Sequence, residues 1–169
     1  MIRLRPEQKL AERSNPITPS GYAALKAKFV ALYEVERPKI VEIVSWAAGN
    51  GDRSENGDYQ YGKKRLREID REARHMYKRL KAAHIIDPAD QPDRTRVFFG
   101  ATVILADEDD VRRTITLVGE DETDVSNQQI GWNSPLARSL KQARVGDTRI
   151  VKLPAGPKEY EVMQIEYPI

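Results

Sequence analysis

Apolar residues near the start of the chain recur at steps of three and four, the spacing of one helix face. They are Tyr22, Leu25, Phe29 and Leu32, followed after a skip by Ile40, Ile43 and Ala47. Thr18 is a candidate N-cap, and Pro19 suits the first helical position because that position needs no N–H donor. Pro38 lies between the two apolar runs, so we expect it to kink this helix or to separate two helical segments. Gly49 and Gly51 are expected to end it.

The next segment has an unbroken heptad pattern, which predicts a second long helix with one apolar seam. Its members are Tyr59, Gly62, Leu66, Ile69, Ala73, Met76, Leu80 and Ala83. The loop between the two helices is too short for a parallel partner, so we expect the helices to pack antiparallel. At ~1.5 Å per residue, each arm reaches about 40 Å.

From Val97 the apolar period changes to two, which is typical of strands. The pattern predicts strands over 97–106, 111–118, 149–153 and 160–167, with a bulge between Val162 and Ile165. Ser134 and Pro135 predict a short helix over 136–142. The predicted fold class is α+β, an N-terminal antiparallel coiled-coil hairpin followed by a C-terminal β-rich domain. We expect a flexible extension over 1–15, the coiled coil over 16–86, a linker over 87–96 and the β-rich domain over 97–169.

Composition excludes several classes of protein. The 169 residues include no cysteine and two histidines, which excludes disulfides, thiolate metal sites and a histidine metal cage. No apolar run approaches the ~20 residues needed to span a bilayer. The first fifteen residues have no apolar signal core, so we expect a cytoplasmic protein without a membrane partner. No nucleophile-base-acid set, P-loop or dinucleotide fingerprint is present, and we do not expect an enzyme.

The loop between the predicted helices is short, acidic and rich in glycine. Asp52 and Glu55 are three residues apart before the second helix, so both carboxylates are expected on one side. Two such carboxylates can share a divalent cation such as Mg²⁺, although a useful site needs further ligands from a partner. The same Asp-x-x-Glu spacing also fits a capping box, and the two interpretations are compatible.

Basic residues follow one face of the second helix, beside the predicted seam. They are Arg67, Arg71, Arg74 and Lys78, spaced four, three and four, and Lys63 and Lys64 precede them near the acidic loop. Such a stripe can attract phosphates. The alternative is a solvated coiled-coil flank that pairs with nearby acids. Because the net charge is only +2, the distribution of charge is more informative than its sum. The position of Lys63 and Lys64 near the acidic loop favours nucleic acid.

Several motifs now resemble one family in order and spacing. They are GDRSEN at 51–56, DYQY at 58–61, KKRLREID at 63–70, VFFG at 97–100, SPLAR at 134–138, VGD at 145–147, PAG at 154–156 and IEY at 165–167. Over residues 17–169 the chain resembles the bacterial Gre transcript-cleavage factors, which are transcription elongation factors, and most closely their B type, GreB. The sequence departs from the family pattern at Asn133, where an aspartate is expected, and at Gly57, where an alanine is usual.

The resemblance implies that the C-terminal domain is similar to FK506-binding proteins and docks on bacterial RNA polymerase at the rim of its secondary channel. The coiled coil then enters the channel, and the factor, expected to act as a monomer, stimulates hydrolysis of the backtracked nascent RNA 3′ end. By resemblance, Asp52 and Glu55 help hold a second Mg²⁺ that is shared with the polymerase, so no cofactor is expected in the isolated protein. Ser54 and Asn56 support this pair, and the basic stripe attracts RNA. The implied docking residues are Ser134, Pro135, Leu136 and Arg138.

Two alternatives stay open. The chain could be a regulator that binds the secondary channel without promoting cleavage, because antagonists also carry acidic tips. It could instead be a coiled-coil adaptor that binds nucleic acid independently of polymerase. The second alternative predicts RNA binding in the absence of polymerase and no effect of substitutions in the acidic loop.

Overall fold

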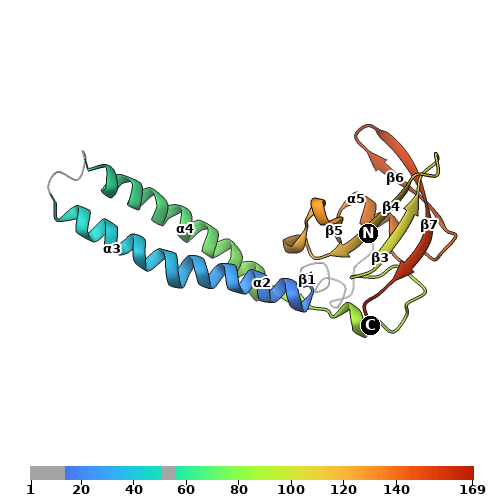
Figure 1. Cartoon of the computed structure of the whole chain (residues 1–169), viewed down its shortest axis with the longest axis horizontal. Helices are drawn as coiled ribbons and strands as arrows, with labels where there is room; N and C mark the ends of the chain where they lie inside the picture. Colours follow the sequence, from blue (N-terminus) through green and yellow to red (C-terminus); the bar gives the residue numbers. More distant parts are fainter. Residues whose placement is uncertain (1–13, 51–55) are drawn as a thin grey trace, which may run out of the picture. The chain divides into compact units, whose positions relative to one another are not determined.

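The computed structural model describes residues 14–50 and 56–169. Its contacts divide the chain into two compact units. Tyr22–Ala82 form a helical unit, and Ala83–Ile169 form a β-rich unit together with the described residues that precede Tyr22. The predicted α+β class is therefore confirmed, with a helix pair followed by a mixed β-sheet (Figure 1).

The helical unit is a hairpin of two packed arms (Figure 1). The first arm contains α2 (Pro19–Val30), a π-helical segment (Ala31–Glu36) and α3 (Arg37–Ala48), and the second arm is α4 (Gly57–Lys81). The two arms enclose an apolar core. Its buried members are Leu32, Ile69 and Ala73, and the half-buried Phe29, Ile40 and Met76 pack against them.

The π-helical segment explains the skip in the apolar pattern of the first arm. Strict steps of three and four from Phe29 and Leu32 would bring Ile43 and Trp46 to the core. A π turn adds one residue to the helix, so the inward positions become Ile40, Val44 and Ala47 instead. The expectation that Ile43 belongs to the seam is therefore wrong, since Ile43 is 42% exposed and Trp46 is 65% exposed.

Pro38 lies in the first turn of α3, directly after the π-helical segment. A proline ring clashes with the carbonyl four residues earlier in a regular helix. The wider π turn relieves that clash, and the N–H of Arg37 bonds to the Leu32 carbonyl across five residues. The two α-helical segments are thus divided by the π-helical segment and not by Pro38, which lies within α3, and the backbone stays helical throughout 19–48.

The seam of the second arm matches its prediction over most of its length. Gly62, Ile69 and Ala73 are buried in α4. Gly62 allows a close approach of the arms, since a Cβ atom there would lie 2.4 Å from Val44 Cγ2. Ala83 is the exception, because α4 ends at Lys81 and Ala83 begins β2.

The β-rich unit contains two sheets. In the smaller, β1 (Asn15–Ile17) pairs in parallel with β2 (Ala83–Ile85). The larger has five strands in the order β5-β4-β3-β7-β6. Their bounds are β3 Thr102–Ala106, β4 Arg112–Val118, β5 Gln129–Gly131, β6 Thr148–Leu153 and β7 Gly156–Glu166, and α5 covers Pro135–Leu140. The sequence pattern did not predict β1, β2 or β5.

The larger sheet confirms the predicted bulge and corrects one predicted strand. Ile104 pairs with Gln164 while Leu105 pairs with Val162, so Met163 is the extra residue. The strand expected over 97–106 begins only at Thr102. The preceding residues form a buried irregular segment, in which the Val97 N–H donates to the Ala143 carbonyl at 2.9 Å.

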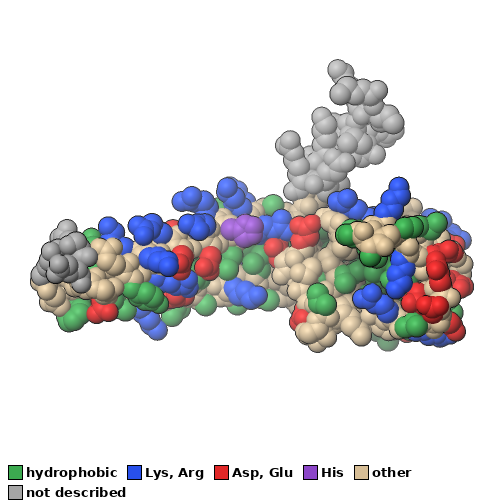
Figure 2. Space-filling view, turned by 90° about the horizontal axis from the view of Figure 1, so that it is seen from above, with side chains coloured by type: hydrophobic (Ala, Val, Ile, Leu, Met, Phe, Trp, Pro, Cys, Tyr) green, Lys and Arg blue, Asp and Glu red, His purple; other side chains and the backbone are tan. Residues whose placement is uncertain are grey.

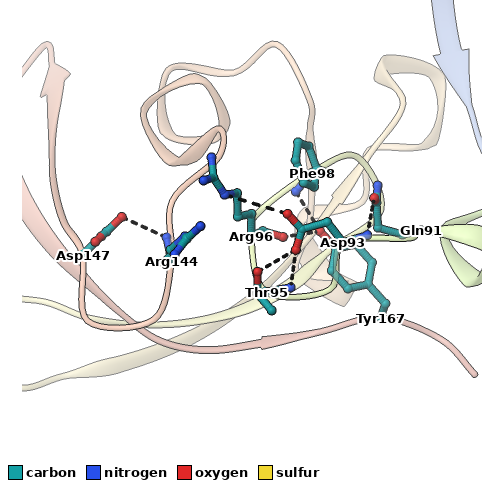
Figure 3. A network of polar contacts seen from close by, with 8 residues as sticks. All are labelled: Gln91, Asp93, Thr95, Arg96, Phe98, Arg144, Asp147 and Tyr167. Atoms are coloured by element: carbon teal, nitrogen blue, oxygen red, sulfur yellow. Dashed lines mark hydrogen bonds and ion pairs between the residues drawn. The ribbon is translucent and has the colours of Figure 1, made fainter.

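Residues 87–96, predicted as a linker, include a 3₁₀ turn (Pro88–Asp90) and a network of hydrogen bonds (Figure 3). Asp93 accepts bonds from the N–H of Thr95 at 3.0 Å and from its hydroxyl at 2.6 Å. The Tyr167 hydroxyl donates to the Arg96 carbonyl at 2.6 Å and accepts from the Phe98 N–H at 2.8 Å. The end of the chain thereby fixes this segment against the β-rich unit. Burial raises the pKa of Tyr167.

The start of α2 is anchored within the β-rich unit. The Thr18 hydroxyl accepts a hydrogen bond from the Gly21 N–H at 3.0 Å, which confirms Thr18 as the N-cap. The same hydroxyl donates to the carboxylate of Glu122, which also accepts from the Thr18 N–H at 3.0 Å. Asn15, which was expected in the flexible extension, is buried in β1, and its side chain donates to Asp121 at 2.7 Å.

Candidate functional site

The acidic loop connects α3 to α4 at the end of the hairpin. Asp52, Ser54 and Glu55 lie outside the described residues, so their arrangement and their roles stay predictions. The structure does describe the two helix ends that hold them. The first arm ends at Ala48, and α4 begins at Gly57.

Asn56 joins these two ends. Its Oδ1 accepts a hydrogen bond from the Tyr59 N–H at 3.2 Å, which makes it the N-cap of α4. Its Nδ2 donates to the Ala47 carbonyl at the end of the first arm, at 2.9 Å. The N-cap of α4 is therefore Asn56, whereas Asp52 and Glu55, to which the capping box was assigned, lie outside the described residues. The sequence signal for this cap is an asparagine immediately before the helix.

The basic stripe lies on the face of α4 that points away from the seam. Its six side chains, Lys63, Lys64, Arg67, Arg71, Arg74 and Lys78, are all exposed. Each residue turns ~100° around the helix axis, so these six positions fall within an arc of about 100° around α4. No acidic residue of α4 lies within that arc. Figure 2 shows Lys and Arg side chains gathered along one edge of the helical hairpin. The stripe therefore lies farther from the seam than the sequence predicted, which was a position directly beside it.

Four acids of the hairpin pair with cations outside the stripe. Arg65 Nε lies 2.7 Å from Glu36, and its Nη1 lies 3.4 Å from both Glu68 and Glu72. Arg37 pairs with Asp70 at 2.7 Å. The hydrogen bond from Arg65 lowers the pKa of Glu36.

In the described part of the chain, the six residues of the stripe make no side-chain hydrogen bond or ion pair. Lys63 makes a cation–π contact, in which its Nζ lies 5.2 Å from the Tyr59 ring centroid. The stripe is thus not the paired coiled-coil flank of the alternative interpretation. Its side chains are exposed and make no ion pair with the described acids of the hairpin.

The predicted docking residues form α5 and its cap. Ser134 Oγ accepts a bond from the Ala137 N–H at 3.3 Å, and Pro135 occupies the first turn. Leu136 packs against the core of the β-rich unit, whereas Arg138 is exposed. The preceding Asn133 donates to Glu120 at 3.1 Å. Pro135 and Arg138 are therefore the exposed members of this set, and the docking role of all four stays a prediction.

The neighbouring surface carries a cation over an aromatic ring. Lys141 Nζ lies 4.4 Å from the Trp132 ring centroid, and the Trp132 ring packs edge-on against Phe99. Burial lowers the pKa of Lys141, and the charge of Arg138 lowers it further.

Over residues 14–50 and 56–169, no cluster of three or more His, Cys, Asp or Glu side chains is arranged to hold a metal ion. Within the same residues, no helix is both long and apolar enough to span a membrane.

Two family models match the chain, one in each half. Residues 15–85 match a model described as transcription elongation factor, N-terminal. Residues 91–167 match one described as transcription elongation factor, GreA/GreB, C-term. The chain belongs to the GreA/GreB family of transcription elongation factors.

Curated GreA/GreB relatives match over nearly the whole chain. The transcription elongation factor GreB of Neisseria meningitidis serogroup B is 52% identical over 92% of this chain and 96% of the relative. GreB of Pseudomonas aeruginosa is 46% identical over 90% of each chain. GreB of Xanthomonas axonopodis pv. citri is 45% identical over 99% of this chain and 98% of the relative. A solved GreA/GreB structure from Nitrosomonas europaea covers 91% of this chain and 100% of its own at 20% identity, with a TM-score of 0.40.

Proposed function

We propose that this GreA/GreB family member acts in the cytoplasm as an elongation factor that binds bacterial RNA polymerase and stimulates cleavage of backtracked nascent RNA. It is an accessory factor and supplies residues to the polymerase's own active site. The observation that carries the proposal is the family match across both units, in a chain whose helical hairpin has Asp52 and Glu55 in its connecting loop.

The hairpin suits the delivery of these carboxylates to a distant centre. The 25 residues of α4 span about 37 Å at ~1.5 Å per residue. The Asn56 bonds fasten the two helix ends beside the loop, which limits their separation. A narrow helix pair can therefore enter a channel that excludes the β-rich unit.

The donor set fits a shared Mg²⁺. Two carboxylates provide the hard oxygen ligands that Mg²⁺ prefers, but they are too few to hold it without further ligands from the polymerase. When bound, Mg²⁺ activates water and stabilises the leaving oxygen in a phosphoryl-transfer site. We assign Asp52 and Glu55 to this ion, and Ser54 and Asn56 to positioning the pair. Because Asn56 already caps α4, its role is to fix where the loop begins.

The exposed stripe on α4 supports RNA as the second partner. Its cations are positioned to follow a phosphate backbone, with an attraction that depends on salt. On the β-rich unit, we assign polymerase docking to the exposed side chains Pro135 and Arg138, supported by Ser134 and Leu136.

The test uses purified polymerase stalled in a backtracked complex with end-labelled RNA. Wild-type protein should shorten the RNA. Asp52→Ala and Glu55→Ala should each lose most of this stimulation while retaining affinity for polymerase, because only the metal ligands are removed.

Asp58→Ala is the matched control, since Asp58 is an exposed acid in the first turn of α4. It removes the same charge near the loop and should leave cleavage intact. Cleavage by both loop variants at the wild-type rate would refute the assignment of Asp52 and Glu55. Binding without cleavage by the wild type would instead identify a regulator that occupies the channel.

A further inference from the structure

A groove on the hairpin is lined by aromatic rings from both arms. Phe29 and Tyr33 come from the first arm, and Tyr77 comes from α4. Its volume is about 420 Å³, within the range of ~300–1,000 Å³ typical of small-ligand pockets. Tyr33 is 46% exposed and Tyr77 is 54% exposed, so the hairpin leaves much of both rings uncovered.

The three rings have different neighbours. Phe29 and Tyr33 stack with ring centroids 5.5 Å apart and planes at 13°. The other neighbour of Tyr33 is the guanidinium of Arg37, 5.7 Å from the ring centroid. Tyr77 lies 6.3 Å from Phe29 at a tilt of 40°. No cation–π partner accompanies Tyr77 within the described residues, so Tyr77 is the ring best placed to stack with a ligand.

The charges at this groove favour a polyanion. Arg74 lines it and belongs to the basic stripe, which continues on either side with Arg71 and Lys78. The acid in the lining, Asp70, is paired with Arg37 at 2.7 Å, so its charge is compensated. An aromatic surface beside a line of cations is the arrangement by which proteins bind single-stranded nucleic acid, through base stacking and phosphate attraction together.

We propose that this groove binds single-stranded RNA, with one base stacked on Tyr77 and the adjacent phosphates held by Arg74 and the rest of the stripe. The geometry thus divides the hairpin between a loop that acts on RNA and a groove that holds it. The binding is a property of the isolated chain. Only the identification of this RNA as the nascent transcript rests on the proposed function.

The experiment measures binding of a short oligoadenylate to the full-length protein without polymerase. An oligomer with the same number of phosphates but no bases is the second probe. Wild-type protein should prefer the oligoadenylate. Tyr77→Ala should weaken its binding by roughly 5-fold to 150-fold, the range found when one base loses its aromatic partner, and should abolish the preference over the abasic oligomer.

Two variants isolate the effect of the ring. Tyr77→Phe keeps the stacking surface and should bind as the wild type does. Tyr61→Ala removes a tyrosine of α4 that is 65% exposed and lies outside the groove, so it should also leave binding unchanged. Helical circular dichroism of all three variants confirms that the hairpin is intact.

Equal binding of the two probes by the wild type, or wild-type affinity in Tyr77→Ala, would overturn the proposal. A Tyr77→Ala protein that binds oligoadenylate normally but loses affinity for RNA-free polymerase would show that the groove packs against protein. The result is independent of the cleavage assay, because Asp52→Ala should bind oligoadenylate normally even where it fails to stimulate cleavage.

Discussion

Asn56 is a single side chain that fastens both arms of the hairpin beside the acidic loop. One of its bonds caps α4, and the other reaches the last turn of α3. Loss of an N-cap side chain costs ~0.5–2 kcal/mol. We therefore expect Asn56→Ala to lower the free energy of unfolding by about 1–2 kcal/mol, measured by urea denaturation.

The Asn56→Ser variant tests the contributions of the two hydrogen bonds separately. Serine keeps an oxygen that can accept from the Tyr59 N–H, but it cannot reproduce the amide donor to the Ala47 carbonyl. Its stability should lie between those of the wild type and the alanine variant. If both variants unfolded at the wild-type urea concentration, the inferred role of Asn56 in joining the arms would be wrong.

Caps at other helices were predictable because their signals are local. Thr18 and Ser134 each precede a proline that suits the first helical turn, and both proved to be N-caps. Asn56 follows two acids with their own capping pattern, and the pattern alone could not show which residue α4 uses. Asp52 and Glu55 stay candidates for chemistry, which the capping interpretation never excluded.

At the scale of the helix, two glycines of α4 should respond oppositely to the same substitution. Gly57 is exposed in the first turn, and a Cβ atom there meets nothing within 4 Å. Gly57→Ala should stabilise the protein by ~0.4–1 kcal/mol, because alanine has less backbone freedom to lose on folding. Gly62 is buried, and a Cβ atom there would lie 2.4 Å from Val44 Cγ2.

Gly62→Ala gains the same helix propensity but must displace Val44, and overpacking of this kind costs ~1–3 kcal/mol. In thermal unfolding, the melting temperature of Gly57→Ala should be higher than that of the wild type, and that of Gly62→Ala should be lower. Gly62→Ala combined with Val44→Ala should recover part of the loss relative to Val44→Ala alone. A Gly62→Ala protein as stable as Gly57→Ala would show that the two arms approach less closely than described.

The elements that the sequence did not predict depend on contacts distant along the chain. β1 and β2 have three residues each and pair with one another across the whole hairpin, so neither has a useful period of its own. β5 is equally short and pairs in parallel with β4. The π-helical segment does have a signal in the sequence, a spacing of eight positions between Leu32 and Ile40. That spacing is one residue longer than a heptad, but a kink or break at Pro38 explained the interrupted apolar pattern equally well.

For the whole molecule, the separation of charge matters more than the net value of +2. On the hairpin, four acids pair with Arg65 or Arg37, and the side chains of the stripe are exposed. Binding of RNA should therefore depend on where a positive charge is removed. Each phosphate contact on a single strand contributes about −0.7 to the slope of log K against log salt.

We expect Arg67→Gln combined with Arg71→Gln to reduce the magnitude of that slope by up to about 1.4 for a short single-stranded RNA. Arg112→Gln combined with Arg113→Gln is the matched control, because both residues are exposed on β4 in the other unit and the net charge falls equally. That control should keep the wild-type slope. Equal losses in the two double variants would mean that RNA affinity depends only on the total charge of the protein. A loss confined to the first would place the phosphates along the middle of α4.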